Sequence, residues 1–78
     1  MGKPVSKQEK QQFADEFVGW RKRLDFSQAE AAEALSKRLG YKLSVRTVQN
    51  WEIARTKPNA LAVSGLRAAM WLVRKETA

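Results

Sequence analysis

Large apolar side chains recur at helical intervals in the first third of the chain, and this spacing limits the fold more than any other feature. The intervals are four, three and four residues, and the side chains are Phe13, Phe17, Trp20 and Leu24. Residues at such intervals share one face of a helix, and that face has to be buried against other elements. Ser6 and Glu9 form a capping-box pattern that predicts the start of this helix, which we expect to end near Asp25.

Start and stop signals of the same kind divide the middle of the chain into two further helices. Ser27 and Glu30 form a second capping-box pattern, and the alanine-rich stretch that follows reaches Gly40, a natural helix stop. Ser44 is a good N-cap residue for a third helix, which we expect to run to about Ala54. A proline shortly afterwards prevents its continuation.

The last third of the chain predicts a helical region that begins after Asn59 and ends near Lys75. We expect its apolar contacts to come from Leu61, Val63, Leu66, Met70 and Val73. Ser64–Gly65 is a weak point that can split the region into two short helices. No stretch alternates like a strand, so the sequence predicts an all-α domain of four or five helices at residues 7–75, after a lead-in at residues 1–6.

Composition narrows the possible functions. The 78 residues include no cysteine and no histidine, which removes disulfides, thiolate zinc sites, and the commonest general base and metal ligand. We therefore expect neither an enzyme nor a metal site, and no cofactor. The formal net charge of +7 is spread along the chain, which favours a folded basic face and an anionic partner.

The chain also lacks the sequence features of a membrane protein. No apolar run reaches the roughly 18–20 residues that cross a bilayer, and the N-terminus has no apolar core of a signal peptide. We expect a cytoplasmic protein with no membrane partner and no small-molecule substrate.

The predicted third helix has two chemically different faces. Val48 and Trp51 lie on one side, where we expect them to enter the core. The other side carries Val45, Arg46, Gln49 and Asn50. Arg and Asn side chains can form bidentate hydrogen bonds with guanine and adenine edges in a DNA major groove. This face is therefore either a DNA-reading surface or a solvated polar surface.

The order of several short motifs resembles a known family. The motifs are Ser27-Gln28, Ala32, Thr47-Val48, Trp51-Glu52 and Arg55-Thr56-Lys57-Pro58. They resemble the helix-turn-helix signature of the phage-repressor and Cro-like (xenobiotic response element type) DNA-binding domains, over residues 13–70. The resemblance implies a compact five-helix domain of the lambda-repressor-like type, with the helix at residues 44–54 in the major groove. Six residues, Ser36–Tyr41, are extra in the connection that precedes this helix.

The resemblance also implies roles for individual residues. Base contacts are expected from Val45, Arg46, Gln49 and Asn50. Around them, we expect phosphate contacts from Ser27, Gln28, Lys42, Ser44, Thr47, Arg55, Thr56, Lys57 and Asn59. Arg21 and Glu52 match a pair that forms a partly buried structural salt bridge in many relatives.

These expectations favour a small repressor that binds double-stranded DNA at a palindromic operator and can regulate its own operon. The family often dimerises through its C-terminal end, and we expect a homodimer in which Trp71 faces outward with Arg67 and Arg74. The alternative is a protein-interaction module, such as an antitoxin or inhibitor, that binds a partner through its C-terminal helix. Structured RNA is a less favoured partner, because a helix of this kind does not fit the deep, narrow groove of A-form RNA.

Overall fold

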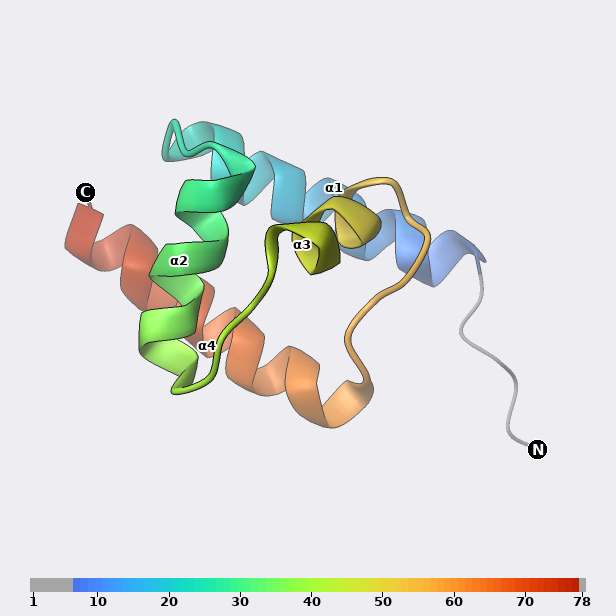
Figure 1. The fold of residues 1–78 in the computed structure, drawn as a ribbon. Coiled ribbons are helices and arrows are strands. Elements are labelled where there is room, and N and C mark those ends of the chain that lie inside the picture. Colours follow the sequence, from blue (N-terminus) through green and yellow to red (C-terminus); the bar gives the residue numbers. More distant parts are fainter. Residues whose placement is uncertain (1–6, 78) are drawn as a thin grey trace.

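The computed structural model describes residues 7–77, which form four helices and no strand (Figure 1). The helices are α1 (Lys7–Arg23), α2 (Gln28–Leu39), α3 (Val45–Glu52) and α4 (Ala60–Thr77). The predicted all-α class is confirmed, with four helices where the family resemblance implied five. The predicted lead-in at residues 1–6, with the Ser6 cap, lies outside the described residues.

The predicted capping box at the start of α2 is present. The hydroxyl of Ser27 accepts a hydrogen bond from the backbone N–H of Glu30 at 3.1 Å, and the Glu30 carboxylate accepts one from the backbone N–H of Ser27 at 2.8 Å. The hydrogen bond from the Ser27 backbone N–H, and after it the Ser27 side chain, lower the pKa of Glu30 below its ordinary value, because they stabilise the charged carboxylate. At the other end, Gly40 has φ of 80° and so ends the helix in the left-handed region.

Two non-glycine residues also take left-handed backbone conformations after helices. Asp25, with φ of 60°, follows α1 at the position where a glycine would be easier to accommodate. Ala54, also with φ of 60°, follows α3. The prediction that α3 reaches Ala54 was therefore wrong by two residues: the helix ends at Glu52, and the carbonyl of Asn50 accepts the backbone N–H of Arg55 at 3.0 Å.

The final helix differs from its prediction in two respects. Ser64–Gly65 does not divide α4, which continues from Ala60 to Thr77. Leu61 was predicted to contact the core, but it is 92% exposed, whereas Val63 and Leu66 are buried. Residues two positions apart in a helix differ by about 200° around its axis. Leu61 therefore points away from the side on which Val63 is buried.

An aromatic cluster joins α1 to α3 at the centre of the molecule. The rings of Phe13 and Phe17 each lie 5.6 Å from that of Trp51, both in edge-on arrangements. Trp20 donates its indole N–H to the backbone carbonyl of Met70 at 2.8 Å, which links α1 to α4. Since α2 packs against both α3 and α4, the four helices share one core.

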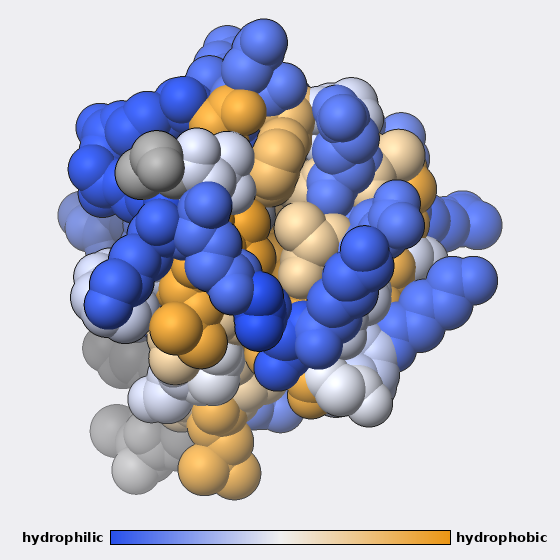
Figure 2. Space-filling view, turned by 90° about the vertical axis from the view of Figure 1, so that its left-hand side faces the viewer, coloured by the Kyte–Doolittle hydropathy of each residue, from blue (hydrophilic) through white to orange (hydrophobic). Residues whose placement is uncertain are grey.

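One face of the molecule carries many hydrophilic side chains. Figure 2 shows hydrophilic side chains over most of one side of the molecule, with apolar atoms visible between them. Within residues 7–77, no helix combines the length and the apolar character needed to cross a membrane.

Candidate nucleic-acid interface

The two faces predicted for the third helix are separated in the structure. Val48 and Trp51 are buried, while Val45, Arg46 and Gln49 are exposed on the other side of α3. The fourth predicted base-facing residue, Asn50, is half-buried at the edge of this face. We call the exposed residues Val45, Arg46 and Gln49, with Asn50 at their edge, the open face of α3.

Hydroxyl groups hold the beginning of α3. The Ser44 side chain accepts the backbone N–H of Thr47 at 3.1 Å, and the two hydroxyl oxygens lie 2.9 Å apart. Ser44 is thus the N-cap, as predicted, and both the backbone N–H and the hydroxyl of Thr47 form hydrogen bonds with its side chain. Both were predicted to contact phosphate, and that role stays a prediction beside the structural one.

The lengthened connection between α2 and α3 is fixed by a residue whose role was not predicted. The Ser36 hydroxyl donates to the carbonyl of Ala32 at 2.6 Å and accepts the backbone N–H of Leu43 at 2.8 Å. One side chain therefore fastens the end of the connector to the middle of α2. A serine inside a predicted helix, beside an unusually long connection, was the only signal for this contact in the sequence.

The two cationic residues at the end of α2 form ion pairs away from α3. Arg38 forms an ion pair with Glu76 of α4, and Lys37 lies 3.8 Å from Glu33 on α2 itself. Lys42 is exposed in the connector just before α3. The structure therefore directs the α2 extension away from α3 and leaves Lys42 as the connector cation close to the open face.

The predicted Arg21–Glu52 ion pair is present and links α1 to the end of α3. The Arg21 Nε–Glu52 Oε2 and Arg21 Nη2–Glu52 Oε1 distances are 2.6 and 2.9 Å, and the side chains are only 16% and 8% exposed. Arg21 also donates to the carbonyl of Phe26 at 2.9 Å, which holds the α1–α2 turn. A bidentate pair of this kind fixes the relative orientation of the two side chains and also pairs their charges.

Two glutamines extend this ion pair to the open face. Gln28 Nε2 donates to Glu52 Oε1 at 3.1 Å, and Gln49 Nε2 donates to Gln28 Oε1 at 3.2 Å. A carboxylate can only accept, so Glu52 determines which end of the Gln28 amide faces Gln49. The buried pair therefore orients an exposed side chain of α3 through Gln28. Sequence reasoning placed Gln28 and Gln49 in separate roles and did not predict this chain of contacts.

Cationic residues precede and follow the open face along the chain. Residues 42–59 contain four cationic side chains and one carboxylate, that of Glu52, which is already paired with Arg21. The cations are Lys42, Arg46, Arg55 and Lys57. None of the four forms an ion pair with another part of residues 7–77.

The loop after α3 brings further predicted residues to the same region. Arg55 and Thr56 are exposed and Lys57 is half-buried, and the loop leads to Asn59 at the start of α4. The Asn59 side chain accepts the backbone N–H of Ala62 at 2.8 Å, so it caps α4 as predicted. Ile53, 69% exposed at the end of α3, was not singled out in the sequence, although its place next to the polar face makes it part of this surface.

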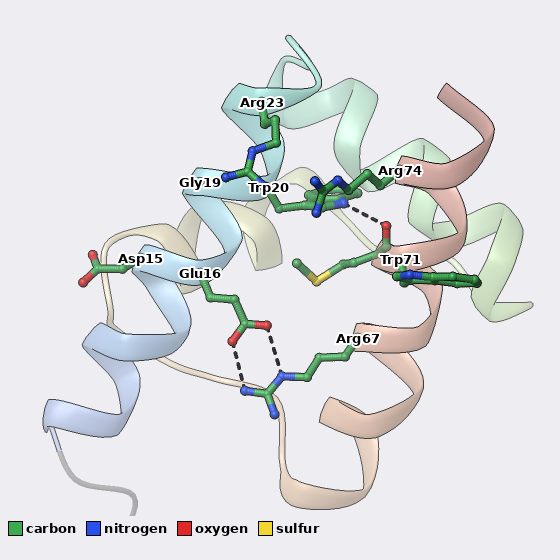
Figure 3. Close-up of a pocket in the computed structure, with 9 residues that line it drawn as sticks. Asp15, Glu16, Gly19, Trp20, Arg23, Arg67, Trp71 and Arg74 are labelled. Atoms are coloured by element: carbon green, nitrogen blue, oxygen red, sulfur yellow. Dashed lines mark hydrogen bonds and ion pairs between the residues drawn. The ribbon is translucent and has the colours of Figure 1, made fainter. Parts of the chain in front are cut away.

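The predicted dimer residues lie elsewhere. Arg67, Trp71 and Arg74 line a groove between α1 and α4, and Trp71 is 58% exposed (Figure 3). Arg67 is not free, because it forms two hydrogen bonds with Glu16 of the same chain, at 2.9 and 3.1 Å.

Comparisons with protein-family models, with curated proteins and with solved structures find no match to this chain. Residues 7–77 contain no group of three or more acidic side chains placed to hold a metal ion.

Proposed function

We propose that this chain is a sequence-specific double-stranded DNA-binding protein that acts as a small transcriptional regulator, with α3 in the major groove. The observation that carries the proposal is the open face of α3. It presents a guanidinium and an amide to solvent, and the carboxylate nearest in sequence, Glu52, is neutralised by Arg21. An anionic partner meets no unpaired acid from α3 itself.

The dimensions of α3 suit this role. A helix with its side chains is about 10–12 Å across, and the major groove of B-DNA is about 12 Å wide, so the groove can admit a helix such as α3. The Ser44 cap places Val45 and Arg46 in the first turn, where a recognition helix makes its base contacts.

The side chains of the open face match base edges by chemistry. The Arg46 fork can take O6 and N7 of one guanine, and an amide such as that of Gln49 or Asn50 can pair with N6 and N7 of adenine. Val45 can contact a thymine methyl group. Because Gln28 already holds one end of the Gln49 amide, the geometry of that base contact is set before binding.

Phosphate contacts in this proposal come from both sides of α3. Gln28, at the start of α2, lies where backbone amides and the helix dipole favour an anion. Lys42 precedes α3, and Arg55 and Lys57 follow it, so cations flank the helix at both ends. Ser27, Ser44, Thr47, Thr56 and Asn59 complete the proposed set.

Repression by occupancy is the simplest action for such a domain, and binding as a homodimer to a palindromic operator follows from the family resemblance. Dimeric binding is tested by measuring how many protein chains bind a duplex with one half-site and a duplex with two half-sites. Two chains on the palindrome at half-sites about one DNA turn apart are expected.

Selection from a random duplex library, followed by titration of the selected duplex in a salt series, tests the proposal. We expect one preferred sequence and an affinity that falls steeply with salt, with a loss on Arg46→Ala. Lys37→Ala is the matched control, since Lys37 is exposed on α2 and its one ion pair within residues 7–77 is with Glu33. Equal affinity for all duplexes would overturn the proposal.

One observation favours a second candidate function, protein interaction. Trp71 is 58% exposed on α4, and exposed tryptophans of this kind are enriched at protein interfaces.

A further inference from the structure

A groove of about 460 Å³ runs between α1 and α4. It is lined by Asp15, Glu16, Gly19, Trp20, Arg23, Arg67, Met70, Trp71 and Arg74. We call it the α1–α4 groove. In Figure 3, α1 and α4 lie in front and α3 is drawn fainter behind them, whereas α3 lies in front of α1 in Figure 1. The groove therefore opens on a different side of the molecule from the open face of α3.

The three arginines of the α1–α4 groove differ in whether they are paired with a carboxylate. Arg67 is bonded to Glu16, and this contact raises the pKa of Arg67 above its ordinary value. Arg23 and Arg74 form no ion pair within residues 7–77. Figure 3 shows both guanidinium groups beside Trp20, at the opposite end of the groove from the Glu16–Arg67 pair. One end of the groove thus carries two unpaired cations.

Between these charges the groove is apolar. Trp20 and Met70 are buried beneath it, and the exposed ring of Trp71 forms one side, with the Lys75 ammonium 5.0 Å from the ring centre. Gly19 contributes no side chain, and a Cβ added there would have no atom within 4 Å. Glycine within a helix costs roughly 0.5–1 kcal/mol of stability relative to alanine, and only a side chain larger than alanine at this position would occupy the groove.

We propose that the α1–α4 groove binds an acidic segment of a partner protein, with an apolar side chain against Trp71 and carboxylates on Arg23 and Arg74. Charge complementarity selects this partner. Guanidinium groups pair with carboxylates in bidentate geometry, and aromatic and arginine side chains dominate the energetics of protein interfaces.

A second copy of this chain is a poorer occupant of this groove, so the homodimer proposed on DNA would pair through another surface. Pairing two grooves about a twofold axis through the groove centre would set the Arg23 and Arg74 end of each copy against the Glu16–Arg67 end of the other, where Glu16 is already paired (Figure 3). Asp15 offers the only acid of the lining that is not paired with Arg67, and its carboxylate already accepts a hydrogen bond from Gln11 at 2.9 Å. The unpaired cations of each copy would therefore meet no free carboxylate in the groove of the other, whereas an acidic segment supplies carboxylates for both.

The test uses a short labelled peptide of leucine and glutamate, and a second peptide with glutamine in place of each glutamate. Binding is measured by fluorescence anisotropy, and the bound surface is mapped from the indole and amide signals in protein NMR spectra. We expect the glutamate peptide to bind and to shift the Trp71 indole signal. The glutamine peptide should bind at least about fivefold more weakly, because it cannot pair with Arg23 and Arg74.

Variants then locate the site. Trp71→Ala and Arg74→Gln should each weaken glutamate-peptide binding by about fivefold or more. Gly19→Leu keeps every charge and fills the groove, so it should abolish binding while the fold is retained. Lys37→Gln removes one positive charge from the exposed side of α2 and should leave peptide binding unchanged.

Several results would overturn the inference. The glutamate peptide could fail to bind, or the groove variants could bind it as tightly as the wild type. Displacement of the peptide by duplex DNA would place the peptide on the open face of α3. Self-association that depends on Trp71, seen in sedimentation, would assign the groove to a second copy. The peptide arms do not require DNA binding, so their outcome is independent of the proposed regulatory function.

Discussion

The open face of α3 and the α1–α4 groove are both cationic, but they differ in what lies between the charges. On α3, Arg46 lies among the amides of Gln49 and Asn50, and Gln49 is held through Gln28 by a buried ion pair. In the groove Arg74 lies beside Trp20 and Trp71 (Figure 3), and within residues 7–77 no hydrogen bond holds its guanidinium. Positive charge alone does not identify a partner. The groups between the charges separate a surface suited to base edges and phosphates from one suited to an acidic protein segment.

The largest effect is expected from Glu52→Gln, which leaves the Arg21 charge unpaired in a site that is mostly buried. Stability should fall by roughly 2–4 kcal/mol, measured by urea unfolding. Glu33→Gln is the control, because the Glu33–Lys37 pair is exposed and should contribute less than about 0.5 kcal/mol. A Glu52 variant as stable as the wild type would show that the polar network does not hold α3.

Arg46→Ala should weaken binding to a selected duplex by about 1–3 kcal/mol, because one bidentate base contact is lost. The same variant should leave the unfolding free energy and the affinity for the acidic peptide unchanged, since Arg46 is exposed on α3 and distant from the groove lining. Equal losses for duplex and peptide would remove the distinction between the two cationic surfaces.

Salt dependence separates the two surfaces further. Arg55→Gln combined with Lys57→Gln should reduce the slope of log affinity against log salt by about 2 for duplex DNA, because two phosphate contacts are lost. The matched double variant, Arg23→Gln with Arg74→Gln, removes the same charge from the groove and should leave that slope nearly unchanged. Identical slopes for the two double variants would mean that DNA contacts both surfaces.

The smallest effect is expected from Gly19→Ala, which should raise the unfolding free energy by about 0.5–1 kcal/mol. An added Cβ meets no atom within 4 Å, so helix propensity acts without a steric penalty. Thermal unfolding measures the gain, and duplex affinity should not change. A loss of stability would indicate that the groove is narrower than described.

The sequence predicted the parts of the fold that depend on local chemistry. Ser27 with Glu30, and Gly40, defined α2 because caps and stops act over a few residues. The predicted break at Gly65 was wrong because the prediction considered only the local cost of glycine to helix stability. Leu66 and Met70 are buried on the same helix, and burial of several side chains outweighs a glycine cost of about 1 kcal/mol.

Leu61 was misplaced for a different reason. Its phase around α4 differs from that of Val63, Leu66 and Met70, so stricter use of the helical period would have excluded it from the core. Its apolar character alone was a poor guide, since single exposed apolar residues are common on protein surfaces.

The candidate interface was predicted less completely. Arg46 and Gln49 were placed on an exposed face because helical phase is a local property. The contact between Gln28 and Gln49 joins residues 21 positions apart on different helices, and depends on how α2 packs against α3. Such packing follows from the whole core and cannot be obtained from spacing along one helix.

The Ser36 hydroxyl gives the connector an unusual tolerance for change. Because it holds Leu43 to α2, and Ser44 then starts α3, the position of α3 is set after the exposed residues Tyr41 and Lys42. Extra residues inserted at that point would enlarge a surface loop whose ends are already fixed, and doubling the length of a flexible loop costs only about 0.6 kcal/mol. The connector is therefore a natural place for length variation during evolution, and for attaching a label or a second domain without moving α3.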